Sequence, residues 1–517
     1  MKRHTTLQIL GGLAMALSLS LTACDKSIEE PLRVGYTPAG ADEKAGTWKT
    51  YILTSPTAVS VAAPKAVTSA DYQAELVSLK QQSASLSREQ QEAVVYWGAG
   101  AVYRWNEIAR ELAARYNLAP ASTPDGKYPV PDAANPLADP KFPFANPPYT
   151  ARALAYLSVA QYDALVSAWH YKYQYNRPAP SRTDAAIRAA LPVSQLPAYP
   201  SEDAVVAAAS VTILKAMFPG EVPYLEAKLQ EHRNSRLWAG MNVESDLTAG
   251  LELGNAVAAS VMGRARTDGM SASNNQTVTT AMIEGAKAMG LTEVWKSQEL
   301  PVRPPMLPNY GAVQTWNFDR ATAIKLRPQA PPAIGSAEYK KAMDELLAIA
   351  KNQTREQARI ANYWADGAGS YTPPGHWHRI AANAAHDARY SEVRMARTLA
   401  LVGTALMDAG ICCWDTKFFY YYPRPQQMDA RIKTSVGLPN FPSYTSGHST
   451  FSSAAATVLG SIFPQQAEAF AAKALEASNS RIYGLIHYRF DCEAGLTCGR
   501  NIGSYAVARG KADGSGL

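Results

Sequence analysis

The chain has 517 residues, 47% of them apolar, and carries 50 basic against 44 acidic side chains, a formal net charge of +6. This length and apolar fraction are enough for a large folded body with a sizeable core. The small net charge, without a basic run interleaved with aromatic residues, does not favour nucleic acid as a partner.

The N-terminus has the pattern of a bacterial lipoprotein signal. A basic start is followed by an apolar stretch from Leu7 to Leu21, and Leu-Thr-Ala directly precedes Cys24. This pattern is typical of a signal peptide over residues 1–23, whose removal leaves Cys24 as an acylated N-terminus. Residues 24–80 are polar with scattered proline and glycine, and we predict a lipid tether and N-terminal extension there. The expected location is the bacterial cell envelope, with the lipid inserted in a membrane.

The rest of the chain is predicted to be helical. Apolar residues recur at helical spacing, for example at Leu154, Leu157 and Leu165, whereas alternating strand-like runs bounded by hairpin turns are scarce. Outside the signal, no stretch reaches the ~20 continuous apolar residues needed to cross a bilayer. The predicted fold class is therefore all-α.

Two parts of the chain match each other at a constant offset of 245 residues. Asn234-Ser235-Arg236 matches Asn479-Ser480-Arg481, and Ala249-Gly250-Leu251 matches Ala494-Gly495-Leu496. One register held over about a hundred residues indicates an internal duplication. We predict two tandem related helical bundles packed as one body: a first bundle over residues 81–280, a connecting segment over 281–360 and a second bundle over 361–517.

The two copies differ at positions that decide their chemistry. At three positions the second copy has Gly447, His448 and His487 where the first has Glu202, Asp203 and Asn242. Two carboxylates directed into an anion site would repel the anion, and without the histidine nothing could bond it covalently. The first bundle is therefore predicted to be degenerate and the second to be catalytic.

Three short segments of the second copy could together bind a tetrahedral oxyanion. They are Lys417-x6-Arg424-Pro425, Ser446-Gly447-His448, and Ser480-Arg481-x5-His487-x3-Asp491. The two arginines offer planar donor forks suited to oxyanions, and the lysine offers a compact positive charge. Ser446 and Gly447 open a predicted helix, whose backbone amides and dipole favour an anion.

The two histidines of these segments are predicted to do the chemistry. A spacing of four residues places His487 and Asp491 on one face of a helix, so the carboxylate can hold the ring nitrogen that points away from the anion. His487 can then bond the anion, and His448 can donate or accept a proton beside it.

These segments resemble those of the superfamily that unites vanadium-dependent haloperoxidases with phosphatidic-acid phosphatase type 2 and bacterial acid phosphatases. The resemblance spans roughly residues 361–514. It implies that His487 anchors vanadate or forms a phosphohistidine, and that His448 is the acid–base residue. It further implies an oxyanion-binding set of Lys417, Arg424, Ser446, Gly447 and Arg481.

Several features favour the haloperoxidase branch of this resemblance. The chain is long and duplicated, and its FPSYTSGHSTF segment resembles that of chloroperoxidases, including Phe441 at the border of the halide region. Trp414 matches another aromatic residue of that pocket, and Asp366 matches a residue that supports one oxyanion-binding arginine. The resemblance thus implies a vanadate-dependent enzyme that oxidises halide with hydrogen peroxide.

Two other functions stay open at this stage. The same oxyanion-binding residues could form the cradle, or anion site, of a phosphomonoesterase. Such an enzyme acts on a phosphate ester through a phosphohistidine and needs no cofactor. A non-catalytic surface lipoprotein is the third possibility.

Four cysteines follow the signal, and the sequence allows two states for them. Either a bridge joins the 412/413 pair to the 492/498 pair, or the buried thiols are free at Cys412, Cys413, Cys492 and Cys498. His376 and His378 lack a partner carboxylate set typical of a metal site.

Overall fold

The structure is a computed structural model that describes residues 33–129, 135, 138, 142–193 and 195–516. The predicted signal peptide and the lipidation site Cys24 lie outside these described residues. Gly35–Leu517 forms one compact unit. Throughout the part of the chain that is described, the regular secondary structure is helical and no strand occurs. The prediction of an all-α fold is therefore confirmed.

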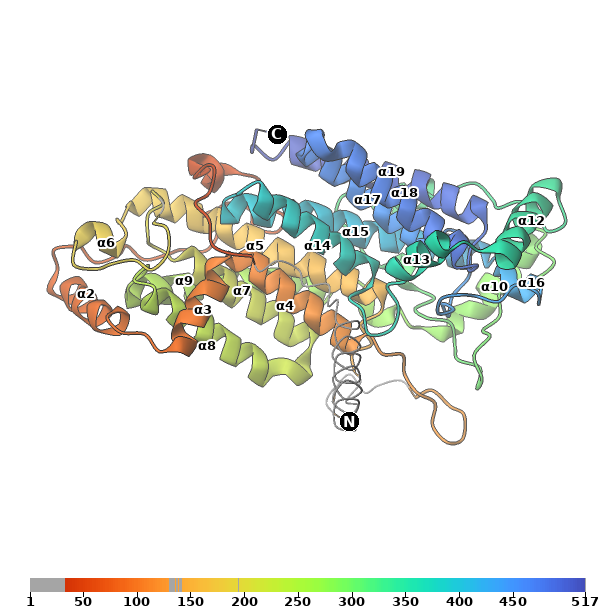
Figure 1. Cartoon of the computed structure of the whole chain (residues 1–517), viewed down its shortest axis with the longest axis horizontal. Helices are drawn as coiled ribbons and strands as arrows, with labels where there is room; N and C mark the ends of the chain where they lie inside the picture. The colour runs from red at the N-terminus through yellow and green to blue at the C-terminus, as the bar shows by residue number, and fades with distance from the viewer. Residues whose placement is uncertain (1–32, 130–134, 136–137, 139–141, 194, 517) are drawn as a thin grey trace, which may run out of the picture. The chain divides into compact units, whose positions relative to one another are not determined.

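The helices fall into two groups and a connecting set (Figure 1). The first half contains α2 Ala70–Ser83, α3 Arg88–Gly98, α4 Ala101–Tyr116, α5 Pro147–Tyr175, α6 Pro180–Thr183, α7 Glu202–Met217, α8 Val222–Trp238 and α9 Glu244–Ala265. The middle contains α10 Thr279–Ala288, α11 Arg320–Lys325, α12 Ala337–Asn352 and α13 Arg355–Tyr363. The second half contains α14 Thr372–Asp387, α15 Glu392–Tyr420, α16 Pro425–Met428, α17 Gly447–Ile462, α18 Ala467–Tyr483 and α19 Arg489–Lys511.

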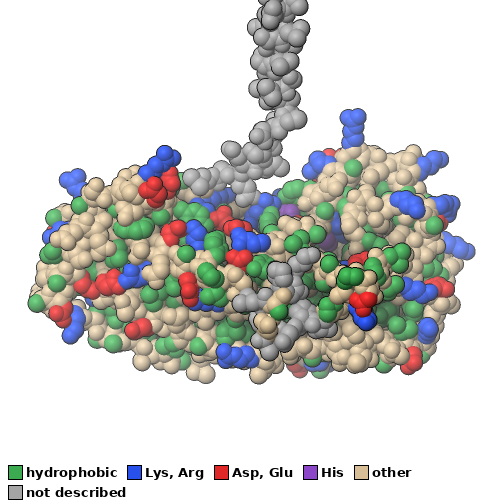
Figure 2. Space-filling model, turned by 90° about the horizontal axis from the view of Figure 1, so that it is seen from below, with side chains coloured by type: hydrophobic (Ala, Val, Ile, Leu, Met, Phe, Trp, Pro, Cys, Tyr) green, Lys and Arg blue, Asp and Glu red, His purple; other side chains and the backbone are tan. Residues whose placement is uncertain are grey.

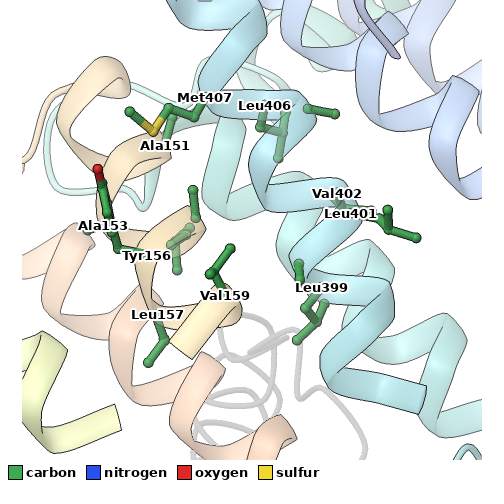
Figure 3. Close-up of a cluster of buried hydrophobic side chains, with 14 of the residues drawn as sticks. Ala151, Ala153, Tyr156, Leu157, Val159, Leu399, Leu401, Val402, Leu406 and Met407 are labelled. Carbon is green, nitrogen blue, oxygen red and sulfur yellow. The ribbon is translucent and has the colours of Figure 1, made fainter. Parts of the chain in front are cut away.

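Two long helices, α5 and α15, form the centre of the fold. Each has 29 residues, begins at a side-chain cap on Asn146 or Ser391, and ends at a left-handed residue, Asn176 or Tyr421. They pack against each other through aliphatic and alanine side chains (Figure 3). The other helices of each half lie around its own central helix: α7 and α9 pack on α5, and α17 and α19 pack on α15.

The helices of the two halves recur at one spacing. Each of the five helices α5 to α9 begins 245 residues before its counterpart among α15 to α19. This recurrence is what a duplicated bundle would give, and the common descent of the two halves stays a prediction.

Part of the predicted tether is built into the compact unit. Asp163 of α5 accepts hydrogen bonds from the backbone amides of Tyr51, Ile52 and Leu53 at 2.7–3.1 Å. Asp42 bonds the Arg394 side chain of α15. The segment that begins at Gly35 therefore contacts both central helices: its backbone amides donate to Asp163 of α5, and its Asp42 accepts from Arg394 of α15.

The predicted disulfide does not form, since all four cysteines of the described residues are free and buried. Their thiols lie near different backbone carbonyls: Cys413 near Thr445, Cys492 near Ser478 and Cys498 near Leu326, at 3.5–3.6 Å.

The most apolar long helix of the described residues lies in the core. The stretch Glu392–Met428 is long and apolar enough to cross a membrane, yet the window that gives this result is completely buried within the protein. It is therefore a core helix here. On the face shown in Figure 2, basic and acidic side chains are interspersed between apolar ones.

Each half contains a close crossing of two helices that depends on a glycine. A Cβ on Gly499 of α19 would lie 2.3 Å from the carbonyl oxygen of Thr450 in α17, and a Cβ on Gly254 would lie 2.3 Å from that of Val205. A backbone oxygen at such a distance can make room for a Cβ atom only if one of the two helices moves. In the second half this crossing sets the position of α17, whose first turn belongs to the site described below.

We expect Gly499→Ala to lower the free energy of unfolding by about 1–3 kcal/mol, because the new methyl group overpacks the crossing. Gly263→Ala is the matched control: Gly263 is a helical, exposed glycine of α9 with no atom within 4 Å of the added Cβ. It should raise stability by about 0.5–1 kcal/mol. Thermal unfolding of the two variants checks this, and a Gly499→Ala midpoint at or above that of the unsubstituted protein would contradict the close crossing.

Candidate active site

The three sequence segments meet at one end of the second bundle. Lys417 lies near the end of α15, Arg424 immediately before α16, Arg481 near the end of α18, and His487 in the turn before α19. Ser446 caps α17, so Gly447 and His448 form its first turn. Short contacts link these segments: Lys417 Nζ donates to Ser443 O at 2.8 Å, and the Ser443 hydroxyl lies 3.3 Å from Nδ1 of His487. Arg424 donates to the carbonyl oxygen of Ile486, the residue before His487, at 2.7 Å.

His487 is held by a short carboxylate network. Its Nδ1 lies 2.8 Å from Oδ2 of Asp491, which also accepts hydrogen bonds from the Ser443 hydroxyl at 2.5 Å and the Tyr488 amide at 3.2 Å. A carboxylate beside Nδ1 favours the tautomer that carries its proton there, which leaves Nε2 with a lone pair. Burial and the surrounding cations lower the pKa of His487 well below its usual range, so the ring is a neutral nucleophile or ligand.

The three cations of the site are held by backbone carbonyl groups. Lys417 Nζ donates to Pro442 O and Ser443 O at 2.8 Å each. Arg424 donates from Nε to Phe441 O and from Nη1 to Ile486 O, at 3.0 and 2.7 Å.

Arg481 follows the same rule. It donates from Nη2 to Ala361 O and Trp364 O at 3.0 and 2.8 Å. Among the described residues, none of the three cations forms an ion pair with a carboxylate.

This arrangement buries positive charge that the protein itself does not balance. Lys417, Arg424 and Arg481 are at most 1% exposed. Burial lowers the pKa of Lys417 to about 7, that of Arg424 to about 9 and that of Arg481 to about 10. Nη2 of Arg424 is buried and has no hydrogen-bond partner. Buried charges and donors are normally paired, so these groups fit an anionic guest with several acceptor oxygens.

The first turn of α17 leaves room for this guest. A Cβ added to Gly447 would find its nearest neighbours at 3.9 and 4.0 Å, on Phe451 and Trp414. Any larger side chain would therefore extend into the site. The amides of this first turn are among those that a helix leaves free for an anion.

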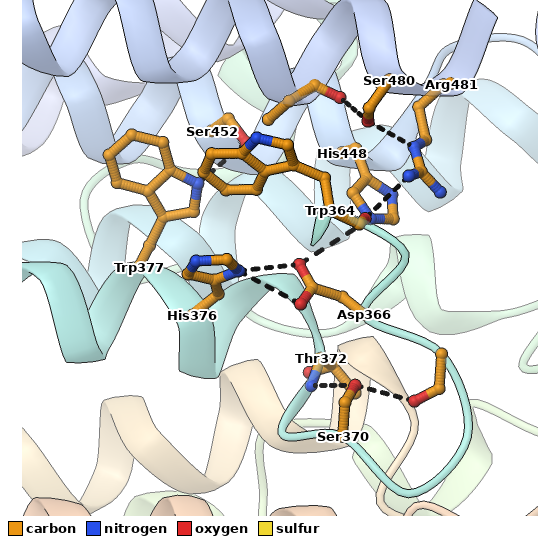
Figure 4. A network of polar contacts seen from close by, with 12 residues as sticks. Trp364, Asp366, Ser370, Thr372, His376, Trp377, His448, Ser452, Ser480 and Arg481 are labelled. Carbon is orange, nitrogen blue, oxygen red and sulfur yellow. Dashed lines mark hydrogen bonds and ion pairs between the residues drawn. The ribbon is translucent and has the colours of Figure 1, made fainter. Parts of the chain in front are cut away.

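His448 belongs to a polar cluster that also contains Asp366 (Figure 4). Nε2 of His448 is buried, has no hydrogen-bond partner and lies 3.9 Å from Oδ2 of Asp366. Asp366 in turn lies 3.1 and 3.2 Å from Nδ1 of His376. Burial and Arg481 lower the pKa of His448 well below its usual range, so the ring is a proton acceptor at neutral pH.

The direct partners of Asp366 are the two histidines. Its charge also acts on Arg481, where it opposes the lowering of the pKa by burial. His376 is a site residue that the sequence reasoning missed. Its partner carboxylate lies ten residues earlier in the chain, across a turn in which Asp366 itself adopts a left-handed conformation with φ 44°. Only the folded turn brings the two together.

An aromatic wall borders the cations. The rings of Trp414 and Phe441 lie 4.8 Å apart between centroids. Lys417 Nζ lies 4.9 Å and the guanidinium carbon of Arg424 5.2 Å from the centre of the Phe441 ring. The two predicted pocket residues are thus in place, and they lower the local dielectric constant beside the charges.

In the first half, carboxylates of the protein itself pair with the corresponding cations. Lys172 Nζ, the counterpart of Lys417, donates to Pro197 O at 2.6 Å and also forms an ion pair of 2.7 Å with Glu202. Arg236 lies 3.6 Å from Asp203. The carboxylates of the first copy neutralise cations that the second copy leaves without a counterion.

Comparison with known proteins agrees with this geometry. Residues 398–509 match the family model of the PAP2 superfamily. Among solved structures, the fold resembles that of the first bacterial vanadium-dependent iodoperoxidase, with a TM-score of 0.54 and 24% identity over 70% of this chain and 91% of that one. It also resembles a holo-type bacterial vanadium-dependent chloroperoxidase, with a TM-score of 0.52 and 14% identity over 75% of this chain and 97% of that one. No curated protein sequence matches the chain significantly.

The all-helical fold is therefore similar to that of the vanadium-dependent haloperoxidases, and it brings the three predicted motifs together in its second half. Its second half matches the PAP2 superfamily model, as the three motifs predicted, and this match supports an enzymatic function.

The lowered pKa of Lys417 predicts a pH dependence of anion binding. Below about pH 7 the amine of the empty site is protonated. Above that pH it is neutral, so the binding of an anion requires uptake of a proton. The affinity for tungstate, whose charge is constant near neutrality, should fall by roughly tenfold per pH unit above pH 7. Calorimetric titrations between about pH 6 and pH 8 measure this.

Lys417→Gln is the control for this pH dependence. It should bind tungstate more weakly, and its affinity should depend less steeply on pH over the same interval, because the amine that takes up the proton is absent. An equally steep pH dependence in the variant would assign the proton to another group.

Gly447→Glu should convert the site into the closed form of the first half. The new carboxylate would pair with Lys417 as Glu202 pairs with Lys172, and tungstate binding should fall by at least about 100-fold, because one charge is neutralised and space is lost. Because the first half accommodates the same pair, the variant should fold. Retained tungstate affinity in a folded variant would contradict the assigned anion position.

Proposed function

We propose that this protein is a vanadate-dependent haloperoxidase that oxidises halide with hydrogen peroxide. The observation that carries the proposal is the group of three buried cations without a carboxylate partner, directly beside a neutral histidine that Asp491 orients. Such a site is electrostatically incomplete until it holds a multivalent oxyanion. The aromatic wall favours halide oxidation because it keeps water, which competes with halide, away from the reacting centre.

The donor set fits vanadate. Nε2 of His487 would be its covalent ligand, while Lys417, Arg424 and Arg481 would face its oxygens. When bound, vanadate supplies an electrophilic centre at which hydrogen peroxide becomes able to oxidise a halide ion.

The side chains of this chain supply the proton handling and the charge. His448, neutral and without a hydrogen-bond partner at Nε2, accepts a proton from the entering peroxide. Asp366 lies close enough to stabilise the imidazolium that forms. Lys417 and the two arginines stabilise negative charge that develops on the oxygens.

A phosphatase is the second candidate, and the PAP2 superfamily match favours it. In this reaction Nε2 of His487 attacks phosphorus, the bond from phosphorus to the alcohol oxygen breaks, and His448 in its protonated form gives that oxygen a proton. Water then cleaves the phosphohistidine and returns a proton to His448. Both reactions use the same residues, and they differ in the role of vanadate, which is required for the first and inhibits the second.

We further propose that a lipid on Cys24 holds the enzyme at the bacterial cell envelope. Its small-molecule substrates, halide and hydrogen peroxide or a phosphate ester, would then be those available outside the cytoplasm.

Parallel assays distinguish the two reactions. Purified protein should brominate a phenolic acceptor when orthovanadate, bromide and hydrogen peroxide are all present, and its hydrolysis of p-nitrophenyl phosphate without metal should be slow. His487→Ala should abolish bromination, and His448→Ala should reduce it by roughly 10²–10⁴-fold, the usual range for loss of an acid–base group. His170→Ala, in the first half, should leave both activities unchanged.

Rapid phosphate-ester hydrolysis that orthovanadate merely inhibits would replace the haloperoxidase by the phosphatase. Full activity of His487→Ala in both assays would overturn both proposals.

A further inference from the structure

A second cavity, of about 350 Å³, lies in the first half of the protein. Its lining includes Trp97 and Trp169 as apolar walls and four charged residues, Glu202, Asp203, Arg236 and Glu392. Four of these six residues stand 245 positions before residues of the active site, so that Trp169, Glu202, Asp203 and Arg236 correspond to Trp414, Gly447, His448 and Arg481. The cavity is therefore the counterpart of the active site in the other half.

This counterpart has three carboxyl groups and only two cations. Glu202 pairs with Lys172, and Asp203 is 3.6 Å from Arg236 and 3.1 Å from Nε2 of His232. Trp105 donates its indole N–H to Nδ1 of His232 at 3.1 Å, so Nε2 carries the proton of a neutral ring. The two cations thus balance Glu202 and Asp203 and leave a third carboxyl group without a charged partner.

The third carboxyl group comes from the other half of the protein. Glu392, at the start of α15, accepts hydrogen bonds from the amides of Ala101 and Val102 at 3.1 and 2.9 Å. No lysine or arginine of the described residues forms an ion pair with it. Burial and the neighbouring carboxylate of Asp203 raise the pKa of Glu392 to about 8. A cation placed here would therefore allow Glu392 to ionise.

A donor in the same cavity also has no partner. Nη2 of Arg236 is buried without a hydrogen-bond partner, and the residue is 4% exposed. Because Arg236 lines the cavity, an acceptor on a ligand would satisfy it. The walls formed by Trp97 and Trp169 suit an apolar or cationic group, since indole faces attract both.

We propose that this cavity binds a small organic ammonium compound that carries a hydroxyl or carbonyl oxygen near its amine and an apolar body. The ammonium group lies beside Glu392 and Asp203, the oxygen accepts from Arg236, and the apolar body packs on Trp97 and Trp169. An inorganic anion is disfavoured by the three carboxyl groups. A divalent metal ion is disfavoured by the guanidinium and ammonium groups of Arg236 and Lys172. This site is independent of the function proposed for the second half.

Ligand titration by calorimetry tests the proposal on the unaltered protein. Phenylalaninol, an aromatic amino alcohol, should bind saturably with one molecule per chain. Phenethylamine, which lacks the hydroxyl acceptor, should bind several-fold more weakly, and hydrocinnamyl alcohol, which lacks the ammonium group, at least about tenfold more weakly, a difference expected for one unmatched charge. Equal binding of the uncharged alcohol, or no saturable binding of phenylalaninol at millimolar concentration, would overturn the proposal.

Two variants locate the bound molecule. Asp203→Asn removes one carboxylate, and Leu196→Trp fills the cavity without changing charge; each should weaken phenylalaninol binding by at least about tenfold. Glu252→Gln, a charge loss on the exposed face of α9, is the matched control and should bind as the unaltered protein does. Circular dichroism verifies that the variants fold. Undiminished binding by a folded Leu196→Trp protein places the ligand elsewhere and overturns the proposal.

The active site is the main alternative location, and tungstate separates the two. Saturation with tungstate, or the substitution His487→Ala, should leave phenylalaninol affinity unchanged. Loss of phenylalaninol binding under either condition would assign the molecule to the catalytic cavity and exclude the proposed site.

Discussion

The second half of this protein depends on the burial of three cations at one point without a carboxylate partner. Desolvation of a charge costs several kcal/mol unless an opposite charge offsets it. The fold holds Lys417, Arg424 and Arg481 in place with backbone carbonyl groups and leaves the counterion to be supplied from solution. Burial, and then the neighbouring positive charges, lower the pKa of both histidines and keep them neutral. Affinity for an oxyanion, nucleophilicity of His487 and proton acceptance by His448 thus all depend on the same buried, positively charged surroundings.

The two halves meet this constraint in opposite ways on similar scaffolds. In the first half, two side chains at the start of α7 enter the cradle and neutralise Lys172 and Arg236. In the second half the corresponding positions are a glycine and a histidine, so the space and the charge are both available. The helix positions around the two cradles correspond, and the difference in chemistry arises from a few side chains. The first half therefore shows, within the same protein, how negative groups can neutralise the cations of such a site.

The sequence predicted most of the site because each motif contributes a residue whose role depends on local spacing. His487 and Asp491 are four residues apart on one helical turn, and that contact was predictable. His376 was missed because its contact with Asp366 depends on a turn with a left-handed residue rather than on helical periodicity. The sequence also left open whether the four cysteines pair, and it gave no packing partner for the N-terminal extension. Both depend on which buried groups neighbouring segments satisfy, and composition does not record this.

The bond between Glu392 and the start of α4 has a consequence for protein engineering. The carboxylate at the first turn of α15 caps a helix of the opposite half, and α15 packs along α5 over much of its length. A fragment restricted to the PAP2 segment would expose that apolar face and lose Asp366 together with the turn that carries it. Minimal catalysts based on this scaffold would have to retain the inactive half or replace its contact face with a designed polar one.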